Sequence, residues 1–448
     1  MTGTLGPARV STKLRRVAEL ARQAPEMVFT TLAHHVDLEF LQEAYRRIRK
    51  AGAVGVDGVT ASQYEEDLWD NLRSLLERFK SGSYKAPPVR RVHIPKGDGK
   101  KTRPIGIPTL EDKILQRAVA MLLDAVYEQD FLECSFGFRR GRSAHDALNE
   151  LRDCLMKTGG GWVIDLDIKS FFDEMDHSHL RSFLDQRVRD GVLRRTIDKW
   201  LKAGVFEAGF VRHPTSGSPQ GGVISPVLSN VYLHEVLDKW IELMVKPVLR
   251  GRVSMVRYAD DALIAFTTER DAQRVLNTLP KRLGKYGLSL NQDKTRLVRF
   301  YPSRKPGDRD DHRNGKGHGT FDFLGFTHYW TRSRRGYWVI KKGTAKGRLR
   351  RTIKRVSSWC REILHKSVYA QHKILVNKLR GHYAYFGVPG NRRAVDNVLL
   401  ETQRIWRKWL SRRSQRGRVS WSKFYKLLRR YPLPRARINY PPARAARR

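Results

Sequence analysis

Two adjacent carboxylates stand between two short apolar runs in the second half of the chain. The tetrapeptide Tyr258-Ala259-Asp260-Asp261 follows residues 254–257 and precedes residues 262–266, and both flanking runs have the length and composition of β-strands. The pattern predicts a tight turn between two paired strands. Hard cations such as Mg²⁺ prefer oxygen ligands and are usually held by one or two carboxylates together with substrate phosphates. The turn is therefore either a divalent-cation site or an ordinary hairpin turn, where Asp is also common.

Carboxylates in a second strand-like run favour the cation site. The run at residues 162–173 carries Asp165 and Asp167. Because side chains alternate between the two faces of a strand, both carboxylates are expected on the same face. Carboxylates from two adjacent strands would hold two metal ions about 4 Å apart, the arrangement that serves in-line phosphoryl transfer. Asp165 and Asp167 are both candidates, although capping of the next turn is a sufficient role for Asp165.

These acidic segments occur together with other motifs in an order that resembles reverse transcriptases. The polymerase motifs of that family are matched by residues 167–173, 217–226 and 258–261. The sequence Ser218-Pro219-Gln220-Gly221-Gly222 is similar to the version in bacterial group II intron-encoded reverse transcriptase/maturases. Other matches in family order are residues 94–108, 135–145, 287–295, 323–326 and 379–387, the last of which resembles the maturase (X, or thumb) motif. Eight segments in this order make the resemblance, which covers roughly residues 35–435, specific.

The resemblance implies an α+β, right-hand polymerase fold. Fingers and palm with antiparallel sheet are expected first, followed by an α-helical thumb/maturase domain. The expected domains are an N-terminal extension (1–34), fingers (35–160), palm (161–330), thumb/maturase (331–410) and a basic C-terminal DNA/RNA-binding-like extension (411–448). Family members often end with an HNH-type, zinc-supported endonuclease. Because Cys134, Cys154 and Cys360 form no Cys-x-x-Cys pair, we expect no such domain here and no disulfide framework.

Local patterns predict several elements independently of the resemblance. Hydrophobic periodicity indicates helices at residues 38–50, at residues 272–283 and from about 335 to 410. A short hairpin is expected around residues 97–99, and residues 302–320 have the composition of an exposed loop. Residues 1–30 form either a helix or a frayed tail. Since no 18 apolar residues run together, we expect a cytoplasmic protein with no membrane partner.

The family pattern assigns roles around the carboxylates. It implies that Asp167, Asp260 and Asp261 are catalytic and hold two Mg²⁺ ions, with the backbone carbonyl of Ile168 as a further metal ligand. Phe172 lies five residues after Asp167. In reverse transcriptases this spacing places a side chain against the 2′ position of the sugar, so Phe172 either excludes ribonucleotides or belongs to the core, as we expect for Phe171.

Further site residues are implied for substrate and template. The expected contacts to the deoxynucleoside triphosphate (dNTP) are Lys96, Arg103, Phe172, Gln220 and Lys294, with Lys100 and Lys101 as alternatives to Lys96. The expected contacts to template or other RNA are Arg139, Arg140, Arg142, Arg380 and Tyr383. The alternative for Gln220 is a helix-start turn with no substrate contact. The alternative for Lys294 is an ordinary surface position. His177, beside Asp176, is expected to be structural.

The charge of the chain points to a polyanionic partner. Its formal net charge is +42, and residues 331–448 hold 34 of the 87 basic residues but only 3 of the 45 acidic ones. Aromatic residues interleave with this basic segment and suit stacking on unpaired bases. The expected partners are therefore group II intron RNA or another RNA template, a DNA primer or target, and dNTPs.

The sequence thus predicts an RNA-directed DNA polymerase of group II intron type with an associated splicing (maturase) role in retrohoming. Two alternatives stay open. One is a domesticated enzyme of the same type in defence or repair, and the other is a maturase-only RNA-binding splicing cofactor. Intact metal carboxylates favour the enzyme over the splicing cofactor, because degenerate maturases typically lose them.

Overall fold

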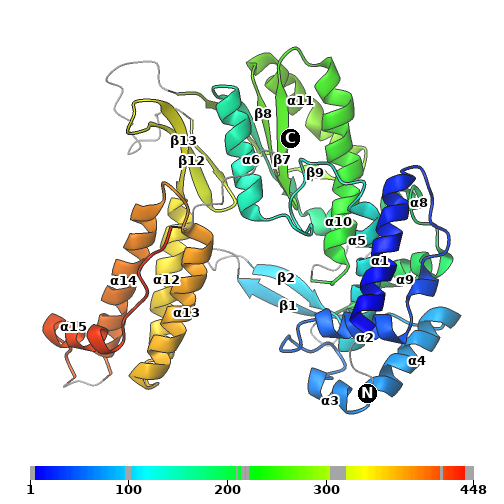
Figure 1. Ribbon diagram of the computed structural model, residues 1–448, viewed down its shortest axis with the longest axis horizontal. Coiled ribbons are helices and arrows are strands. Elements are labelled where there is room, and N and C mark those ends of the chain that lie inside the picture. Colours follow the sequence, from blue (N-terminus) through cyan, green and yellow to red (C-terminus); the bar gives the residue numbers. More distant parts are fainter. Residues whose placement is uncertain are drawn as a thin grey trace. The chain divides into compact units, whose positions relative to one another are not determined.

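The computed structural model describes residues 6–95, 102–207, 210–212, 217, 221–302, 319–413 and 417–438 (Figure 1). The chain divides into two compact units. Unit 1 comprises Met1–Cys154 and Gly161–Leu297, and unit 2 comprises Leu155–Gly160 and Val298–Arg448. Both units mix helices and strands, so the prediction of an α+β fold is confirmed, and the architecture is consistent with a right-hand polymerase followed by a helical region.

Helix α5 (Leu110–Tyr127) is the centre of the larger core of unit 1. It is apolar on nearly all sides, and thirteen of its residues are buried, as expected for a helix enclosed by others. The helices α1 (Gly6–Gln23) and α2 (Leu38–Arg47) pack against it. The N-terminal segment is therefore a helix rather than a frayed tail. The remaining helices before the palm are α3 (Ala61–Glu66), α4 (Leu68–Ser81) and α6 (Ala144–Lys157).

Residues 89–107 contain the two strands of the predicted hairpin. Strands β1 (Val89–Pro95) and β2 (Thr102–Ile107) pair antiparallel, and the turn that joins them lies outside the described residues. β1 also pairs parallel with β5 (Val205–Glu207), which pairs with β6 (Phe210–Arg212), so the sheet order is β2-β1-β5-β6.

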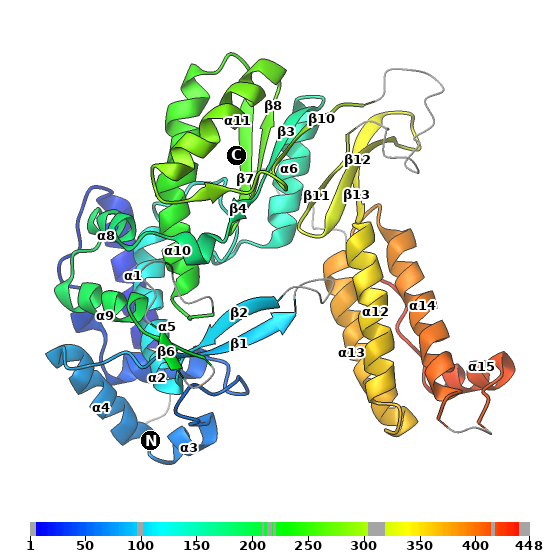
Figure 2. The ribbon, with the colours of Figure 1, turned by 180° about the vertical axis from the view of Figure 1, so that it is seen from behind.

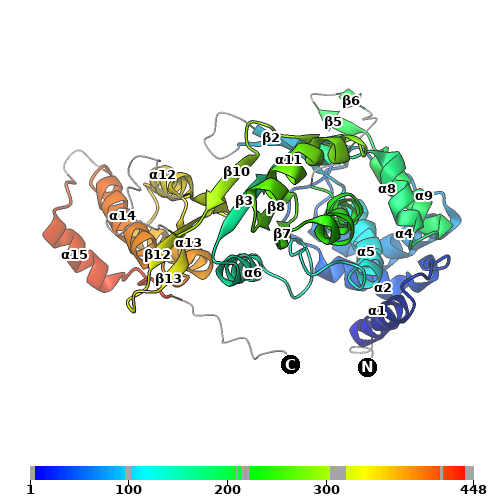
Figure 3. The ribbon, with the colours of Figure 1, turned by 90° about the horizontal axis from the view of Figure 1, so that it is seen from above.

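A second sheet of unit 1 carries the acidic segments. Within unit 1 its strands run in the order β3-β8-β7, formed by β3 (Gly161–Leu166), β8 (Asp261–Phe266) and β7 (Val253–Tyr258). These strands run side by side in Figure 2, and the predicted helix α11 (Glu269–Gly284) covers one face of the sheet in Figure 3. The apolar side chains of α11 at helical spacing lie in the core beneath that face. Further described elements of unit 1 include β4 (Ile168–Lys169), α7 (Phe171–Glu174), α8 (His177–Asp185), α9 (Gly191–Leu201), α10 (Ser225–Leu233) and β9 (Ser289–Leu290).

Unit 2 begins with a sheet and continues as helices. Strands β11 (Phe321–Phe323), β12 (Phe326–Arg332) and β13 (Trp338–Thr344) form an antiparallel sheet. The expectation of helix from about residue 335 was wrong over β13, because this segment completes that sheet. The helices are α12 (Lys346–Glu362), α13 (Val368–Phe386), α14 (Arg392–Leu410) and α15 (Trp421–Arg430).

Asn391 joins the sheet of unit 2 to its helices. Its side-chain oxygen accepts the backbone N–H of Thr344 at 2.8 Å, and its amide nitrogen donates to Thr344 Oγ1 and to the carbonyl of Phe386, both at 2.8 Å. One buried amide therefore fixes the end of β13 against the start of α14. The described part of the chain contains no helix with the length and apolarity needed to cross a membrane.

Candidate active site

The carboxylates Asp260 and Asp261 lie at the predicted turn. Strands β7 and β8 pair up to Tyr258 and Asp261, which face each other, and leave only Ala259 and Asp260 between them. Ala259 has φ of +58°, a left-handed conformation that costs an L-residue about 1 kcal/mol or more. The hairpin prediction is confirmed, and the turn is strained at the residue that precedes both carboxylates.

Strand pairing brings Asp167 beside this turn. In the antiparallel pair of β3 and β8, Leu166 faces Ala262. Asp167 and Asp261 are the next residues along the two strands, so they stand opposite each other at the end of the paired segment. Asp165 faces Leu263 and forms an ion pair with Arg296 at 3.3 Å. The structure therefore gives Asp165 a cationic partner of its own and leaves Asp167 closest in register to the turn.

The segment after β9 holds Asp167 in place. Lys294 Nζ donates to the two carboxylate oxygens of Asp167 at 2.9 and 3.2 Å, and Asn291 Nδ2 donates to one of them at 3.0 Å. The backbone N–H of Asp167 donates to Thr295 Oγ1 at 3.2 Å. Lys294 thus reaches the carboxylate cluster rather than standing free on the surface. The next residue, Ile168, is buried in β4 and pairs with Leu290.

Several negatively charged carboxylates lie close together in this cluster. Reduced solvation, followed by repulsion from Asp260, Asp167 and Asp165, raises the pKa of Asp261 from 3.8 to about 6, although Lys294 acts in the opposite sense. Like charges held together in this way favour a bound cation. Within the described residues, no three His, Cys, Asp or Glu side chains lie in a group that could hold a metal ion as they stand. The carboxylate oxygens suit a divalent cation, and Lys294 supplies a positive charge that contacts one of them, Asp167.

The raised pKa predicts a pH-dependent stability. Because the folded state binds the Asp261 proton more tightly than the unfolded state, this group stabilises the fold below about pH 4 and loses that contribution as the pH rises through about 6. In EDTA, Asp261→Asn should therefore raise the melting temperature at pH 8 and leave it nearly unchanged at pH 4. Thermal melts across that range measure the difference, and an equal shift at both pH values would contradict the assignment.

A fully buried arginine lies beneath the turn. Arg257 has no exposed surface, and its guanidinium binds both carboxylate oxygens of Asp238 at 2.7 and 2.6 Å. Its other donors reach Asn230 Oδ1 at 3.1 Å, Ser135 Oγ at 2.8 Å and the carbonyl of Ala259 at 3.0 Å. All five N–H donors of this side chain therefore have acceptors. The bond to Ala259 ties the strained turn directly to the core.

The motif at residues 135–145 packs against the same turn. A Cβ on Gly137 would lie 2.2 Å from the backbone nitrogen of Ala259, so only glycine fits there. Asn230 Nδ2 donates to the carbonyl of Gly137 at 2.8 Å. Our reading of the sequence missed Arg257, Asp238, Asn230, Asn291 and Thr295 as supports of the site. The available signal was an Arg inside an otherwise apolar strand next to the acidic pair.

Phe171 and Phe172, in the segment after Asp167, differ in burial as expected. Phe171 is buried in the core, whereas Phe172 is only partly buried and contacts Phe171 edge to face at 5.3 Å between ring centroids. A Cβ on Gly217 would lie 2.7 Å from the carbonyl of Phe172, so the chain that leads into the Ser-Pro-Gln motif passes against this turn. His177 Nε2–H donates to the carbonyl of Gly217 at 2.5 Å, a backbone contact that suits the structural role expected for it.

The three arginines expected at the template differ in exposure. Arg139 is buried, binds Glu128, and donates to the carbonyls of Leu132 and Ser135 at 2.6 and 2.9 Å. This burial contradicts a direct phosphate contact and makes Arg139 a support for its own loop. Arg142 is half-buried and pairs with Glu133 at 2.6 Å, whereas Arg140 is exposed. Of the three, Arg140 has the exposure that a template contact requires.

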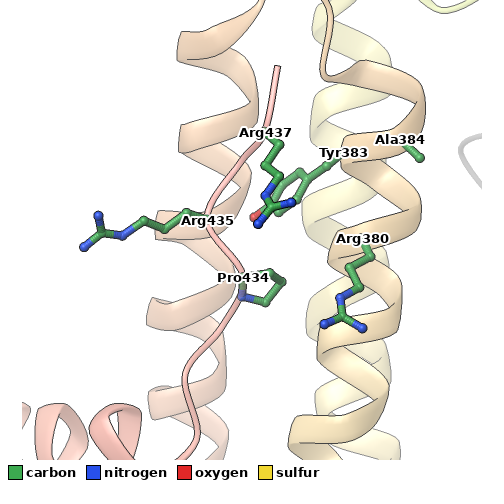
Figure 4. Close-up of a pocket in the computed structure, with 6 residues that line it drawn as sticks. All are labelled: Arg380, Tyr383, Ala384, Pro434, Arg435 and Arg437. Atoms are coloured by element: carbon green, nitrogen blue, oxygen red, sulfur yellow. The ribbon is translucent and has the colours of Figure 1, made fainter. Parts of the chain in front are cut away.

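The remaining predicted residues fall in three places. Lys96, Lys100, Lys101 and Gln220 lie outside the described residues. Arg103 is exposed on β2, opposite Ile94. Arg380 and Tyr383 belong to α13 in unit 2, where they line a cavity together (Figure 4). The structure thus brings together Asp167, Asp260, Asp261 and Lys294, with Ile168 and Phe172 on the segment that follows Asp167.

Comparison with known proteins shows the family of this chain. The family model described as reverse transcriptase (RNA-dependent DNA polymerase) matches residues 94–328. Protein YkfC of Escherichia coli is 35% identical over 325 residues, which cover 64% of this chain and 84% of YkfC. The group II intron-encoded protein LtrA of Lactococcus lactis is 36% identical over 235 residues, which cover 51% of this chain and 38% of LtrA. The chain therefore belongs to the reverse transcriptase family and is related to group II intron-encoded reverse transcriptase/maturases.

Proposed function

We propose that this protein extends a DNA primer on an RNA template with dNTPs, using Asp167, Asp260 and Asp261 to hold two Mg²⁺ ions. When bound, such ions lower the pKa of the primer hydroxyl and neutralise charge on the triphosphate. The observation that carries the proposal is the register of β3, β7 and β8, which sets three carboxylates at adjoining strand ends. Burial and, after it, repulsion from the neighbouring carboxylates raise the pKa of Asp261, and a bound cation would relieve that repulsion.

The chain's own residues perform the positioning. The buried Arg257 holds the carbonyl of Ala259 and thereby fixes the turn that carries Asp260 and Asp261. Asn291 and Thr295 orient Asp167 through its carboxylate and its backbone N–H. Lys294 contacts the Asp167 carboxylate at 2.9 Å and would be available to a triphosphate once another cation occupies the cluster. Phe172, partly exposed beside this segment, would contact the sugar at its 2′ position, and Arg103, Lys96 and Gln220 are proposed to contact the dNTP.

The test is primer extension by the purified protein. A DNA oligonucleotide annealed to an RNA template is incubated with dNTPs and Mg²⁺, and the same reaction is run with ribonucleotides. We expect magnesium-dependent DNA synthesis that prefers dNTPs, and Phe172→Ala should increase ribonucleotide incorporation at least about tenfold because the steric block is gone. Extension that is unaffected by EDTA would contradict the metal chemistry. Extension in which Phe172→Ala leaves sugar selection unchanged would exclude Phe172 as the gate.

A second role is RNA binding that assists intron splicing. It is favoured by the charge of residues 331–448, which hold 34 basic and 3 acidic residues, most of them in unit 2 helices. Of the relatives, the nuclear intron maturase 2 of Arabidopsis thaliana is 28% identical over 249 residues, 44% of this chain and 34% of that protein. A domesticated role without an intron uses the same chemistry, and a ribozyme sequence flanking the gene would distinguish the two.

The basic segment predicts a steep salt dependence of RNA binding. Each phosphate neutralised by Lys or Arg releases counterions, so the logarithm of the association constant should fall with the logarithm of salt at a slope of about −4 or steeper for single-stranded RNA. Fluorescence anisotropy of labelled RNA over a salt series measures the slope. A slope near zero would contradict an electrostatic grip by residues 331–448.

A further inference from the structure

A single buried amide side chain connects α5 to the chain that leads into α10. Gln116 lies on α5 and is only 4% exposed. Its side-chain oxygen Oε1 accepts the backbone N–H of Val223 at 2.8 Å, although the two residues lie 107 positions apart in sequence. Because α5 and α10 also pack against each other, this hydrogen bond joins two helices of the larger core of unit 1.

The start of α10 has no capping side chain of its own. The first N–H groups of a helix lack partners inside it, and a polar side chain at the N-cap position usually accepts one of them. That position is occupied here by Ile224, whose side chain cannot accept a hydrogen bond. The chain just before α10 is therefore fixed from another helix, through the bond between Val223 and Gln116.

The glycine two residues before Val223 lies against β2. A Cβ on Gly221 would lie 2.6 Å from the carbonyl oxygen of Gly106 and 2.6 Å from Ile105 Cγ2. Its φ of +117° is a conformation that glycine adopts readily and other residues rarely adopt. The same strand carries the exposed Arg103. β2 and α5, which follow one another in the chain, thus contact the motif at residues 217–226 at two neighbouring points.

Other bonds fix the rest of this motif and of α10. At the start of the motif, the carbonyl of Gly217 accepts the Nε2–H of His177 at 2.5 Å. Further along α10, Asn230 bonds to other segments of unit 1 through both its amide nitrogen and its oxygen. Loss of the Gln116 bond would therefore release residues 221–223 and leave the body of the helix in place.

We propose that Gln116 is a positioning residue for nucleotide binding. By holding Val223, it keeps Gly221 in contact with β2 and thereby keeps the motif at a fixed distance from Arg103. The inference rests on the proposed function, because it takes the dNTP as the ligand of Arg103. The carboxylate cluster has separate supports, so the chemical step should depend little on Gln116.

Steady-state incorporation of one nucleotide tests this separation. Gln116→Met keeps the length of the side chain, but its thioether accepts hydrogen bonds only weakly. We expect KM for the dNTP to rise about tenfold and kcat to change less than about threefold. Gln116→Glu keeps an acceptor oxygen and should retain KM within about threefold of wild type. A lower kcat at unchanged KM, or equal KM increases in the two variants, would overturn the inference.

The matched control weakens α5 without touching this bond. Thr109 Oγ1 accepts the backbone N–H of Asp112 at 3.3 Å and caps the start of the same helix. Thr109→Val keeps the shape of the side chain and removes that cap, so it should lower the melting temperature and leave KM for the dNTP unchanged. If Thr109→Val raises KM as much as Gln116→Met, Gln116 acts only through the stability of α5 and the inference is wrong.

Two further measurements need no catalysis. Hydrogen exchange of the Val223 amide, followed by mass spectrometry, should be about tenfold faster in Gln116→Met than in wild type. With a primer that ends in a dideoxynucleotide and cannot be extended, the dNTP concentration that half-saturates the complex should also rise about tenfold. An unchanged value in either measurement would overturn the inference. A wild-type protein that binds dNTP in this complex but extends no ordinary primer would contradict the proposed function and leave the inference standing.

Discussion

Asp260→Asn should lower the rate of primer extension by about three orders of magnitude, or roughly 4 kcal/mol in activation free energy. The substitution keeps the size of the side chain and removes the negative charge that would hold a metal ion and offset the charge of the reacting phosphates. Asp260 lies in the turn, apart from the β7–β8 pairing, so the fold should be unaffected. Single-turnover primer extension at saturating Mg²⁺ measures the loss, and RNA affinity should stay unchanged.

The matched control is Asp165→Asn. Asp165 lies on β3, two residues before Asp167, but its carboxylate pairs with Arg296. Its replacement should change the rate less than about tenfold, because a partly exposed ion pair contributes little. A loss at Asp165 as large as that at Asp260 would show that Asp165 has been wrongly set aside in favour of Asp167. A full rate in Asp260→Asn would remove the two-metal mechanism altogether.

The second large effect is expected at Arg257. Arg257→Met leaves Asp238 fully buried without a counterion, and removal of one member of a buried pair typically costs about 3–5 kcal/mol of stability. The matched control is Arg296→Met, which breaks an exposed pair and should cost less than about 1 kcal/mol. Urea unfolding of the full-length chain, followed by its fluorescence, measures the change in the free energy of unfolding for both variants.

A double substitution separates stability from positioning. In Arg257→Met/Asp238→Leu both charges are gone, and apolar replacement of a buried ion pair is often neutral in stability. We expect this variant to regain most of its resistance to urea but to remain slow in primer extension, because the bond from Arg257 to the carbonyl of Ala259 is still missing. If activity returns together with stability, the arginine has only a structural role.

The local parts of the site could be predicted from the sequence. The turn at Asp260 follows from two strand-like runs on either side of it, and α11 follows from apolar residues at helical spacing. Phe171 and Phe172 divided into core and partly exposed positions as expected. In each of these cases a few neighbouring residues determine the outcome.

Features that depend on distant segments could not be predicted. Arg257 bonds with Ser135, which lies 122 residues away in sequence, and no periodic pattern reports such a pair. Arg139 and Arg140 are adjacent in sequence, yet one is buried and the other exposed, because the carbonyls of Leu132 and Ser135 turn toward the first. The charge of β13 resembles that of the segments beside it in sequence and therefore does not mark it as a strand. Its strand structure depends on pairing with β12.

The division of the chain into units has a consequence for synthesis on the ribosome. Residues Leu155–Gly160 belong to unit 2, although the chain on both sides of them belongs to unit 1. A Cβ on Gly160 would lie 2.5 Å from the carbonyl oxygen of Phe300, so this short segment rests against residues translated much later. Unit 2 therefore cannot assemble until translation has passed Phe300, and a fragment that starts at Val298 would lack part of its own packing. Nascent-chain proteolysis should find residues 155–160 accessible until the later segment has emerged.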